Sequence, residues 1–390
     1  MKHGWDYKKL GELVQVLNGY AFKSSLYENQ GIRVLRITNV QKGNIVDDDP
    51  KYYPLSLTDE IRNYLLKESD LLMSLTGNVG RVGLLTKEML PAALNQRVAC
   101  LRILSNGLNL GFLFHYLNSD KFEQDAVLSA KGIAQKNMST EWLKDYKLPL
   151  PPISVQQSIV SELEKINELI RLKKEQLKDY DNLAQSIFYE MFGDPVVNEK
   201  GWEVKKIGEV CLIERGGSPR PIKDYITEDE DGLNWIKIGD AQEGSIFINS
   251  TKEKIRKEGL KKTRMVHKGD FILSNSMSFG RPYIMGVDGC IHDGWLVLHD
   301  TNNTFNKLYL YYSLAHKSMY QQFKQMAVGG VVNNLNSEMV RRVLVLVPPL
   351  IVQQEFANRI ELIEMQKKQI ISTIQDLETL LASRMQYWFD

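Results

Sequence analysis

The stretch Leu150-Pro-Pro-Ile-Ser-Val-Gln-Gln157 occurs twice in the chain, the second time as Val347-Pro-Pro-Leu-Ile-Val-Gln-Gln354. The copies lie 197 residues apart (354 − 157). The same spacing relates Lys8-Lys-Leu-Gly-Glu12 to Lys205-Lys-Ile-Gly-Glu209. Repetition at a fixed spacing is the signature of a duplicated structural unit. The chain is therefore predicted to contain two copies of one unit, each a globular segment followed by a long helix.

A long helix is predicted after each diproline, reaching about Phe192 in the first copy and nearly the C-terminus in the second. Proline suits a first helical turn because it has no amide hydrogen to leave unbonded there. Apolar residues recur in steps of three and four, which is typical of a coiled-coil seam. The seam positions are Ile159, Leu163, Ile166, Ile170, Leu177 and Ile187 in the first helix, and Phe356, Ile360, Ile363, Ile370, Ile374, Leu377 and Leu381 in the second.

These two helices most simply bury their seams against each other as an antiparallel pair, because a whole globular segment separates them. About 38 residues at roughly 1.5 Å each would give a rod about 55 Å long. The alternative is that each helix packs only on its own globular segment. The predicted fold is α+β, with two repeated domains at 1–150 and 196–347 and their helices at 151–195 and 348–390.

The composition is that of a soluble globular protein, with 390 residues of which 25% are charged and 43% are hydrophobic. No apolar run approaches the ~20 residues of a membrane span, and the N-terminus has no signal-peptide core. The three cysteines are scattered, so neither a disulfide framework nor a zinc site is indicated. A reducing cytoplasm is the expected location.

Charge is divided unevenly along the chain. Residues 1–150 carry 19 basic and 16 acidic side chains, and residues 196–347 carry 21 and 18. The helical segments carry 5 against 8 and 4 against 6. The globular segments are thus moderately basic, as a polyanion-binding surface would be, and the helices are acidic.

Both globular segments show the same order of predicted elements. In the first, strands are expected at 32–37, 70–74 and 98–103, followed by a helix from Leu110 to about Phe122. In the second, strands are expected at 234–238, 270–274 and 295–298, followed by a helix from Asn306 to about Phe323. The offset rises to about 200 in mid-domain and then returns to 197. One scaffold with divergent loops suggests two similar binding sites that recognise different ligands.

Three repeated loops are candidates for those sites. Hydroxyl, amide and guanidinium groups could bond phosphates or base edges, although Gly-Arg in a hairpin loop could equally pair with a neighbouring carboxylate. A glycine-containing loop before each diproline could be a flexible turn, and the Asn-Gln to His-Asp difference could be surface drift. The candidates are Thr76, Asn78, Arg81, Asn95, Gln96, Lys131, Gln135, Lys136 and Asn137, and Ser276, Ser278, Arg281, His292, Asp293, Asn333 and Asn334.

No catalytic motif is recognisable. The two diproline segments lack the polar residue and the aromatic residue that amino-methyltransferases place around Pro-Pro, and no glycine-rich turn suits S-adenosylmethionine. The segment Gly77-Asn-Val-Gly-Arg-Val-Gly83 lacks the Lys-Ser/Thr of a P-loop. The six histidines show no metal-ligand spacing. Neither a catalytic residue nor a metal ligand is predicted.

The combined order of these features resembles the specificity subunits of Type I restriction–modification systems. It comprises the doubled plan, the Pro-Pro-x-x-x-Gln-Gln helix starts, the Phe192-Gly-Asp-Pro195 exit before Gly201-Trp202, and the Gly-Arg loops. The resemblance implies two target recognition domains, each reading one half of a split, asymmetric DNA sequence. The helices would set the spacing and dock two modification subunits. Those subunits would bring S-adenosylmethionine, and restriction/motor subunits would use ATP with Mg, so this chain would need no cofactor.

Other functions remain compatible with the sequence. A coiled-coil scaffold joining two protein-binding domains would bind no DNA. A self-contained methyltransferase or nuclease would need motifs that are missing. A specificity chain could also serve a modification-only system without a restriction subunit.

Overall fold

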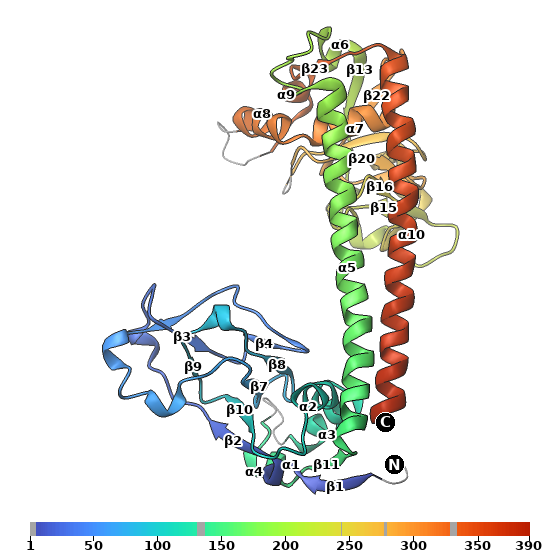
Figure 1. The fold of residues 1–390 in the computed structure, drawn as a ribbon. Helices are drawn as coiled ribbons and strands as arrows, with labels where there is room; N and C mark the ends of the chain where they lie inside the picture. The colour runs from blue at the N-terminus through green and yellow to red at the C-terminus, as the bar shows by residue number, and fades with distance from the viewer. Residues whose placement is uncertain (1–4, 131–136, 243, 277–278, 328–333) are drawn as a thin grey trace. The chain divides into compact units, whose positions relative to one another are not determined.

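The computed structural model describes residues 5–130, 137–242, 244–276, 279–327 and 334–390. The chain divides into two compact units, the first formed by residues 1–174 with 372–390 and the second by 175–371 (Figure 1). Unit 1 therefore combines two stretches that lie far apart in the sequence, whereas unit 2 is one continuous stretch.

Unit 1 is built on a four-stranded antiparallel sheet in the order β2 (Val14–Asn18), β10 (Val98–Ile103), β7 (Leu71–Ser74), β8 (Val82–Leu84). A second sheet has the order β6 (Tyr52–Tyr53), β3 (Ile32–Leu35), β9 (Ala92–Leu94). Two further strand pairs are β1 (Asp6–Lys9) with β11 (Lys147–Leu150), and β4 (Val40–Gln41) with β5 (Asn44–Ile45). The helices of the domain are α1 (Leu10–Leu13), α2 (Leu110–Leu117), α3 (Asp120–Ser129) and α4 (Thr140–Asp145).

Unit 2 repeats this plan with longer sheets. One sheet has the order β13 (Cys211–Arg215), β22 (Trp295–Asp300), β19 (Phe271–Ser274), β20 (Pro282–Met285), β16 (Phe247–Ile248). The other runs β14 (Ile226–Thr227), β17 (Glu253–Ile255), β15 (Leu233–Ile236), β21 (Gly289–Ile291), β18 (Arg264–Val266). A pair joins β12 (Val204–Lys206) and β23 (Leu344–Leu346), and the helices are α6 (Ile207–Val210), α7 (Lys307–Ala315), α8 (Lys317–Ala327) and α9 (Ser337–Arg341).

The strand register shows how closely the two units correspond. Asn18 lies opposite Ala99 in unit 1, and Arg215 lies opposite Leu296 in unit 2, so both partners are shifted by 197 residues. The β7–β8 hairpin pairs Leu71 with Leu84, and its counterpart pairs residues 271 and 284, an offset of 200. The two offsets predicted from the sequence are therefore those of the folded chain.

Two long helices complete the fold, α5 (Ile153–Phe192) and α10 (Leu350–Phe389). They pair antiparallel within each unit: Lys174 contacts Glu378 in unit 1 at 2.8 Å, and Asp181 contacts Lys367 in unit 2 at 2.7 Å. The fully buried seam residues are Ile159, Leu163, Phe356 and Ile360, the nearly buried ones are Ile166, Ile170, Ile363, Ile370 and Ile374, and the half-buried ones are Leu177, Ile187, Leu377 and Leu381.

Each helix also packs on globular cores. The start of α5, with Ile159 and Leu163, joins the core of unit 1 together with Phe389 from the end of α10. The end of α5, with Phe188 and Phe192, joins the core of unit 2. Helix pairing and packing on the domains are therefore not alternatives, because the same turns serve both purposes: the Phe188 ring lies 5.6 Å from that of Phe356 on the other long helix and 6.0 Å from that of Tyr309 on α7.

The helix predicted from Leu110 to about Phe122 is wrong in one respect, because it consists of two helices, α2 and α3. The first ends at Leu117 with Asn118 as its C-cap, and Ser119 caps the second, since its hydroxyl accepts a hydrogen bond from the Phe122 amide at 3.3 Å. Unit 2 is broken at the corresponding place, where His316 has an extended backbone between α7 and α8.

Candidate nucleic-acid interface

The Gly-Arg loops are tight hairpins of the same geometry in both units. In unit 1 the Ser74 hydroxyl accepts a hydrogen bond from the Arg81 amide at 3.1 Å, and in unit 2 Ser274 accepts from Arg281 at 2.9 Å. The glycine before each arginine has a positive φ, +79° at Gly80 and +76° at Gly280. Residues with a side chain rarely adopt this backbone conformation, so the turn requires glycine. The shared loop shape thus comes from a serine and a glycine.

Backbone hydrogen bonds bring the three candidate loops of unit 1 together. The Leu75 amide donates to the Arg97 carbonyl at 3.0 Å, and the Met138 amide donates to the Leu75 carbonyl at 2.9 Å. Thr76 and Asn137 also form an isolated bridge. Segments 75–76, 95–97 and 137–138 therefore meet in what we call the three-segment junction.

Unit 2 contains the same three-segment junction, formed by 275–276, 292–294 and 334–335. The Asn275 amide donates to the Gly294 carbonyl at 2.9 Å, and the Leu335 amide donates to the Asn275 carbonyl at 2.9 Å. The Asn275 side chain adds a bond to the Asp293 carbonyl at 3.1 Å. Candidate residues that are far apart in the sequence are thus neighbours in both units.

Beside each junction a glycine, Gly19 in unit 1 and Gly216 in unit 2, allows its backbone to lie very close to a backbone carbonyl of the junction. A Cβ on Gly19 would lie 2.1 Å from the Asn95 carbonyl oxygen, and one on Gly216 would lie 2.3 Å from that of His292. These distances exclude any side chain at either position. The segments after β2 and β13 consequently border the junctions.

The candidate side chains differ in how freely they face solvent. Asn78, Gln96, Asn137 and Asn334 are exposed, Asn95, Arg81, Ser276, Arg281, His292 and Asp293 are half-buried, and Thr76 is at the buried limit with 9% exposed. Lys131, Gln135, Lys136, Ser278 and Asn333 lie outside the described residues. The exposed amides are therefore the side chains best placed to reach a ligand.

Asn95 and His292 perform the same local task. The Asn95 Oδ1 atom accepts a hydrogen bond from the Arg97 amide at 3.2 Å, and the His292 Nδ1 atom accepts one from the Gly294 amide at 2.9 Å. Each side chain closes the turn two residues ahead of itself. Part of the hydrogen-bonding capacity of both is thus used within the junction.

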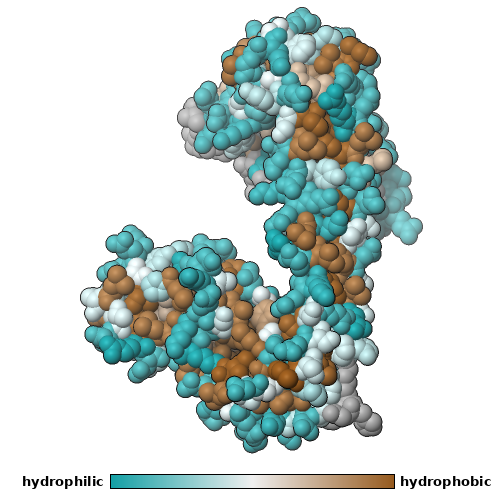
Figure 2. All heavy atoms as spheres, in the orientation of Figure 1, coloured by the Kyte–Doolittle hydropathy of each residue, from teal (hydrophilic) through white to brown (hydrophobic). Residues whose placement is uncertain are grey.

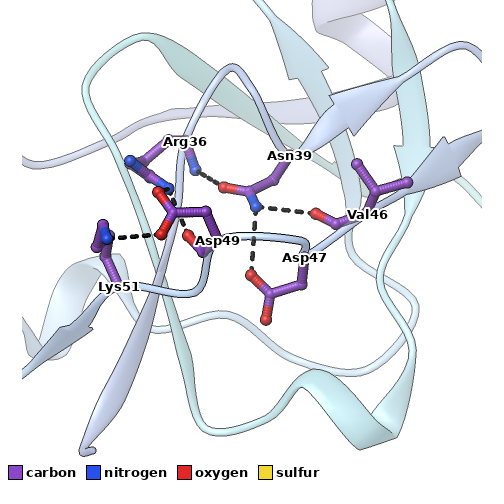
Figure 3. A network of polar contacts seen from close by, with 6 residues as sticks. All are labelled: Arg36, Asn39, Val46, Asp47, Asp49 and Lys51. Carbon is purple, nitrogen blue, oxygen red and sulfur yellow. Dashed lines mark hydrogen bonds and ion pairs between the residues drawn. The ribbon is translucent and has the colours of Figure 1, made fainter. Parts of the chain in front are cut away.

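The Arg81 guanidinium donates to the Gln41 side-chain carbonyl, so the partner found for it among the described residues is an amide. Gln41 lies on the β4–β5 hairpin, which a polar network holds in place (Figure 3). At its centre the Asn39 side chain, 3% exposed, accepts from the Arg36 amide at 2.8 Å and donates to the Val46 carbonyl at 2.8 Å. The network therefore sets the position of the arginine.

Asp293 in unit 2 anchors a basic loop that the sequence analysis did not identify. Its carboxylate accepts a hydrogen bond from Ser218 Oγ at 2.7 Å and lies 2.9 Å from His292 Nε2. Its carbonyl accepts from Arg215 Nε at 3.0 Å, and the exposed Arg220 lies 3.9 Å from the carboxylate. The Arg215-Gly-Gly-Ser-Pro-Arg220 loop is thus held with two exposed arginines beside the junction.

The electrostatics of this cluster follow from its geometry. Burial, assisted by Lys237 and Arg215, holds the pKa of His292 below its ordinary value despite Asp293. Burial opposes ionisation of Asp293, but the Ser218 hydrogen bond and the neighbouring His292 outweigh it and lower the Asp293 pKa. The lowered pKa keeps Asp293 ionised, so the anchor carries a negative charge near Arg215 and Arg220.

In unit 1 the corresponding loop is aromatic. The Tyr20 amide donates to the Leu94 carbonyl at 2.8 Å, which places Tyr20 directly beside Asn95. The Tyr20 ring lies 5.1 Å from that of Phe22 and 5.2 Å from that of Tyr64. The two junctions therefore share their backbone but adjoin different chemistry, basic in unit 2 and aromatic in unit 1.

The described residues contain no group of three or more His, Cys, Asp or Glu side chains placed to hold a metal ion. Cys100, Cys211 and Cys290 are buried free thiols, and burial raises the pKa of each, to about 11 for Cys290. None of the described helices combines the length and apolarity of a membrane span.

Comparison with known protein families shows to which family the chain belongs. The family described as "Type I restriction modification DNA specificity domain" matches twice, over residues 2–179 and 199–378. The chain belongs to this family. The two matched stretches coincide with the two repeats, so it is a Type I specificity protein with two recognition domains.

Individual relatives agree with this assignment. The chain is 22% identical to the Escherichia coli EcoBI specificity subunit over 92% of its own length and 78% of the relative's. It is 31% identical to the E. coli EcoAI specificity subunit, but this match spans only 29% of that protein, and a match to the Methanocaldococcus jannaschii MjaVIII subunit spans 44% of that one.

Solved structures support the fold. A chain from a type I R-M system, solved to describe complex assembly and conformational transition, covers 100% of this chain with a TM-score of 0.65 at 18% identity. The S subunit from M. genitalium covers 99% with a TM-score of 0.54 at 14% identity. The α+β fold with two repeated domains and paired helices is therefore confirmed.

Proposed function

We propose that this specificity protein reads a bipartite, asymmetric DNA target, with one recognition domain for each half-site. The observation that carries the proposal is the three-segment junction, which has the same backbone in both units but different side chains. Exposed amides such as Asn78 and Gln96 can bond base edges, and arginines such as Arg220 can bond phosphates. Two unlike junctions on one scaffold suit two unlike half-sites.

The paired helices serve in this proposal as the spacer between half-sites and as the docking surface for two modification subunits. Apolar side chains stand exposed on both helices among charged ones (Figure 2). Apolar residues that are exposed three positions apart on a helix are neighbours, and contiguous exposed apolar patches mark protein–protein contacts. The exposed apolar residues include Leu169, Leu172 and Leu183 on α5, and Leu362, Met365 and Leu380 on α10.

No reaction is assigned to the chain itself. Modification subunits would contribute S-adenosylmethionine and adenine methylation, and restriction/motor subunits would contribute ATP-dependent cleavage with Mg. Most junction side chains are amides, hydroxyls and guanidinium groups, which suit recognition of DNA more than chemistry upon it, and the His292 and Asp293 side chains bond the Gly294 amide and the Ser218 hydroxyl. We place the assembled complex in the cytoplasm, where cellular DNA is accessible to it.

The test is to map methylated adenines by single-molecule sequencing in cells that express the chain with its modification subunit. The expected result is a split motif with a non-specific gap of fixed length, which also gives both half-sites. New methylation should be absent when the chain is omitted. If no methylation appears although both proteins are soluble, DNA reading is excluded and a scaffold for two protein-binding domains becomes the better function.

A further inference from the structure

Unit 1 contains a cavity of about 700 Å³ between α2, the start of α3, the β4–β5 turn and the two long helices. Every residue that lines it belongs to this unit. Its apolar lining includes Leu110, Phe114, Leu381 and Met385. A cavity of this size can hold a large side chain with part of the segment that carries it.

Polar groups at the wall of the cavity include an acceptor without a donor. Asn118 donates from Nδ2 to the Phe114 carbonyl at 2.9 Å, whereas its buried Oδ1 atom has no hydrogen-bond partner in the described structure. His115, only 6% exposed, lies on the same wall. A buried acceptor without a donor is costly unless a bound group supplies one.

Acidic side chains surround the cavity. Lys42 is neutralised by Asp120 at 2.9 Å and Glu123 at 2.7 Å. Glu378 is paired with the exposed Lys174, and Glu164 has no ion pair within the described residues. With Asp390, which also lines the cavity, the five carboxylates exceed the two lysines, so a bound cation would be favoured.

Unit 2 fills the corresponding place with its own aromatic side chains. The positions of Phe114 and His115 are held there by Tyr311 and Tyr312, and that of Met385 is held by Phe188. The ring of Phe188 stacks on that of Tyr312 at 6.4 Å. Tyr311 Oη donates to the Ser245 carbonyl at 3.4 Å, on the turn that corresponds to the β4–β5 turn.

Unit 2 also supplies its own cation. Lys367 contacts Asp181 at 2.7 Å and Glu364 at 2.8 Å. The corresponding residue in unit 1 is Ile170, which has no charge, and Asp181 corresponds to Glu378. Unit 2 therefore has one aromatic ring more, Phe188 in place of Met385, and a mostly buried cation, Lys367 in place of Ile170, whereas Lys174 of unit 1 is exposed.

We propose that the cavity of unit 1 docks a segment of a partner protein that carries an aromatic or large aliphatic side chain next to a lysine or arginine. That segment would supply what unit 2 provides internally. The identity of the partner as a modification subunit rests on the proposed function. The consequence is that the two modification subunits dock unequally, and only the one at unit 1 inserts an anchor.

The experiment fills the cavity in the full chain with Ala382→Trp, because Ala382 lines it, and uses Gln185→Trp at the matched position of unit 2 as the control. A second pair tests charge, with Glu164→Lys against the matched, exposed Glu361→Lys. Purified modification subunit is titrated by calorimetry and the complexes are weighed by native mass spectrometry. Melting curves verify that each variant is folded. If Ala382→Trp does not fold, Glu164→Lys still tests the proposal.

The wild type and both controls should bind two modification subunits. Ala382→Trp and Glu164→Lys should weaken one of the two binding events by on the order of tenfold or more. If these variants bind both subunits as the wild type does, the inference is overturned but the proposed function is not. This result is expected if the cavity holds only a small molecule. Loss of both binding events would also overturn the inference. A wild-type chain that binds no modification subunit would overturn the proposed function and the inference together.

Discussion

The first glutamine after each diproline explains why that short motif is repeated. Gln156 is fully buried, and its Oε1 accepts from the Asn109 amide at 2.8 Å while its Nε2 donates to the carbonyls of Gly107 and Pro151, both at 2.8 Å. Gln353 makes the corresponding three bonds in unit 2. Each glutamine fastens the start of a long helix to the loop before α2 or α7.

Gln156→Leu is therefore expected to destabilise unit 1 by about 2–4 kcal/mol, because it leaves the buried Pro151 carbonyl and the part-buried Asn109 amide and Gly107 carbonyl without their partner. Hydrogen exchange with mass spectrometry would show faster exchange in residues 5–174, while Gln353→Leu would affect unit 2 instead. The neighbouring exposed Gln157→Leu should change little. Equal effects of Gln156→Leu and Gln157→Leu would contradict the clamp.

His115 should make unit 1 sensitive to acid. Burial lowers the pKa of His115 from 6.5 to about 4, so the folded unit resists a proton that the unfolded chain accepts. Above about pH 6.5 the residue is neutral in both states and has no effect. Between about pH 6.5 and 4 it reduces stability as the pH falls, by at most about 1.4 kcal/mol per pH unit.

Urea unfolding of the wild type and His115→Gln from pH 7.5 to 4.5 would measure this dependence. The difference in unfolding free energy between the two proteins should change as the pH falls, in favour of the variant. His299→Gln, at a half-exposed position in unit 2, serves as the comparison. A pH-independent difference for His115→Gln would show that the histidine is not kept neutral.

At the scale of the element, the paired helices could be predicted from the sequence because a seam depends only on local periodicity. The break between α2 and α3 was missed because Ser119 is tolerated within a helix and its capping role appears only when the Phe122 amide is placed. The basic loop was missed because its position depends on a distant hydrogen bond, from the Gly217 amide to the Ile291 carbonyl at 3.2 Å. Two arginines flanking Gly-Gly-Ser-Pro were the available signal.

Arg220 in that loop is expected to contact a DNA phosphate, since its side chain is 83% exposed beside the junction. In complex with modification subunits, Arg220→Ala should weaken DNA binding and reduce the magnitude of the slope of log affinity against log salt by about one. Lys200→Ala, an exposed cation outside the loop, is the control. An unchanged slope for Arg220→Ala would remove this loop from the interface.

At the scale of the molecule, the proposal that the helices set the spacing makes a prediction about length. Removing one heptad from each helix, residues 170–176 and 373–379, keeps the seam in register. It shortens both helices by about 10 Å, which corresponds to about three base pairs. Methylation mapping should then show the same two half-sites with a shorter gap.

The matched control removes the heptad from one helix alone, which disrupts the pairing of the seams and should reduce methylation without defining a new gap. Altered half-sites at an unchanged gap would contradict the spacer role. The same mapping thus separates a change in spacing from a change in sequence reading.

The division of the chain into a continuous and a discontinuous unit has a consequence for protein synthesis. Residues 175–371 emerge from the ribosome as one stretch, so unit 2 can complete its core as soon as it is made. Unit 1 must wait for residues 372–390, which bring Phe389 to its core. At about 5–20 residues per second the delay is roughly 10–40 s. During translation the domain made first is therefore the one finished last, with apolar surface that a chaperone could shield.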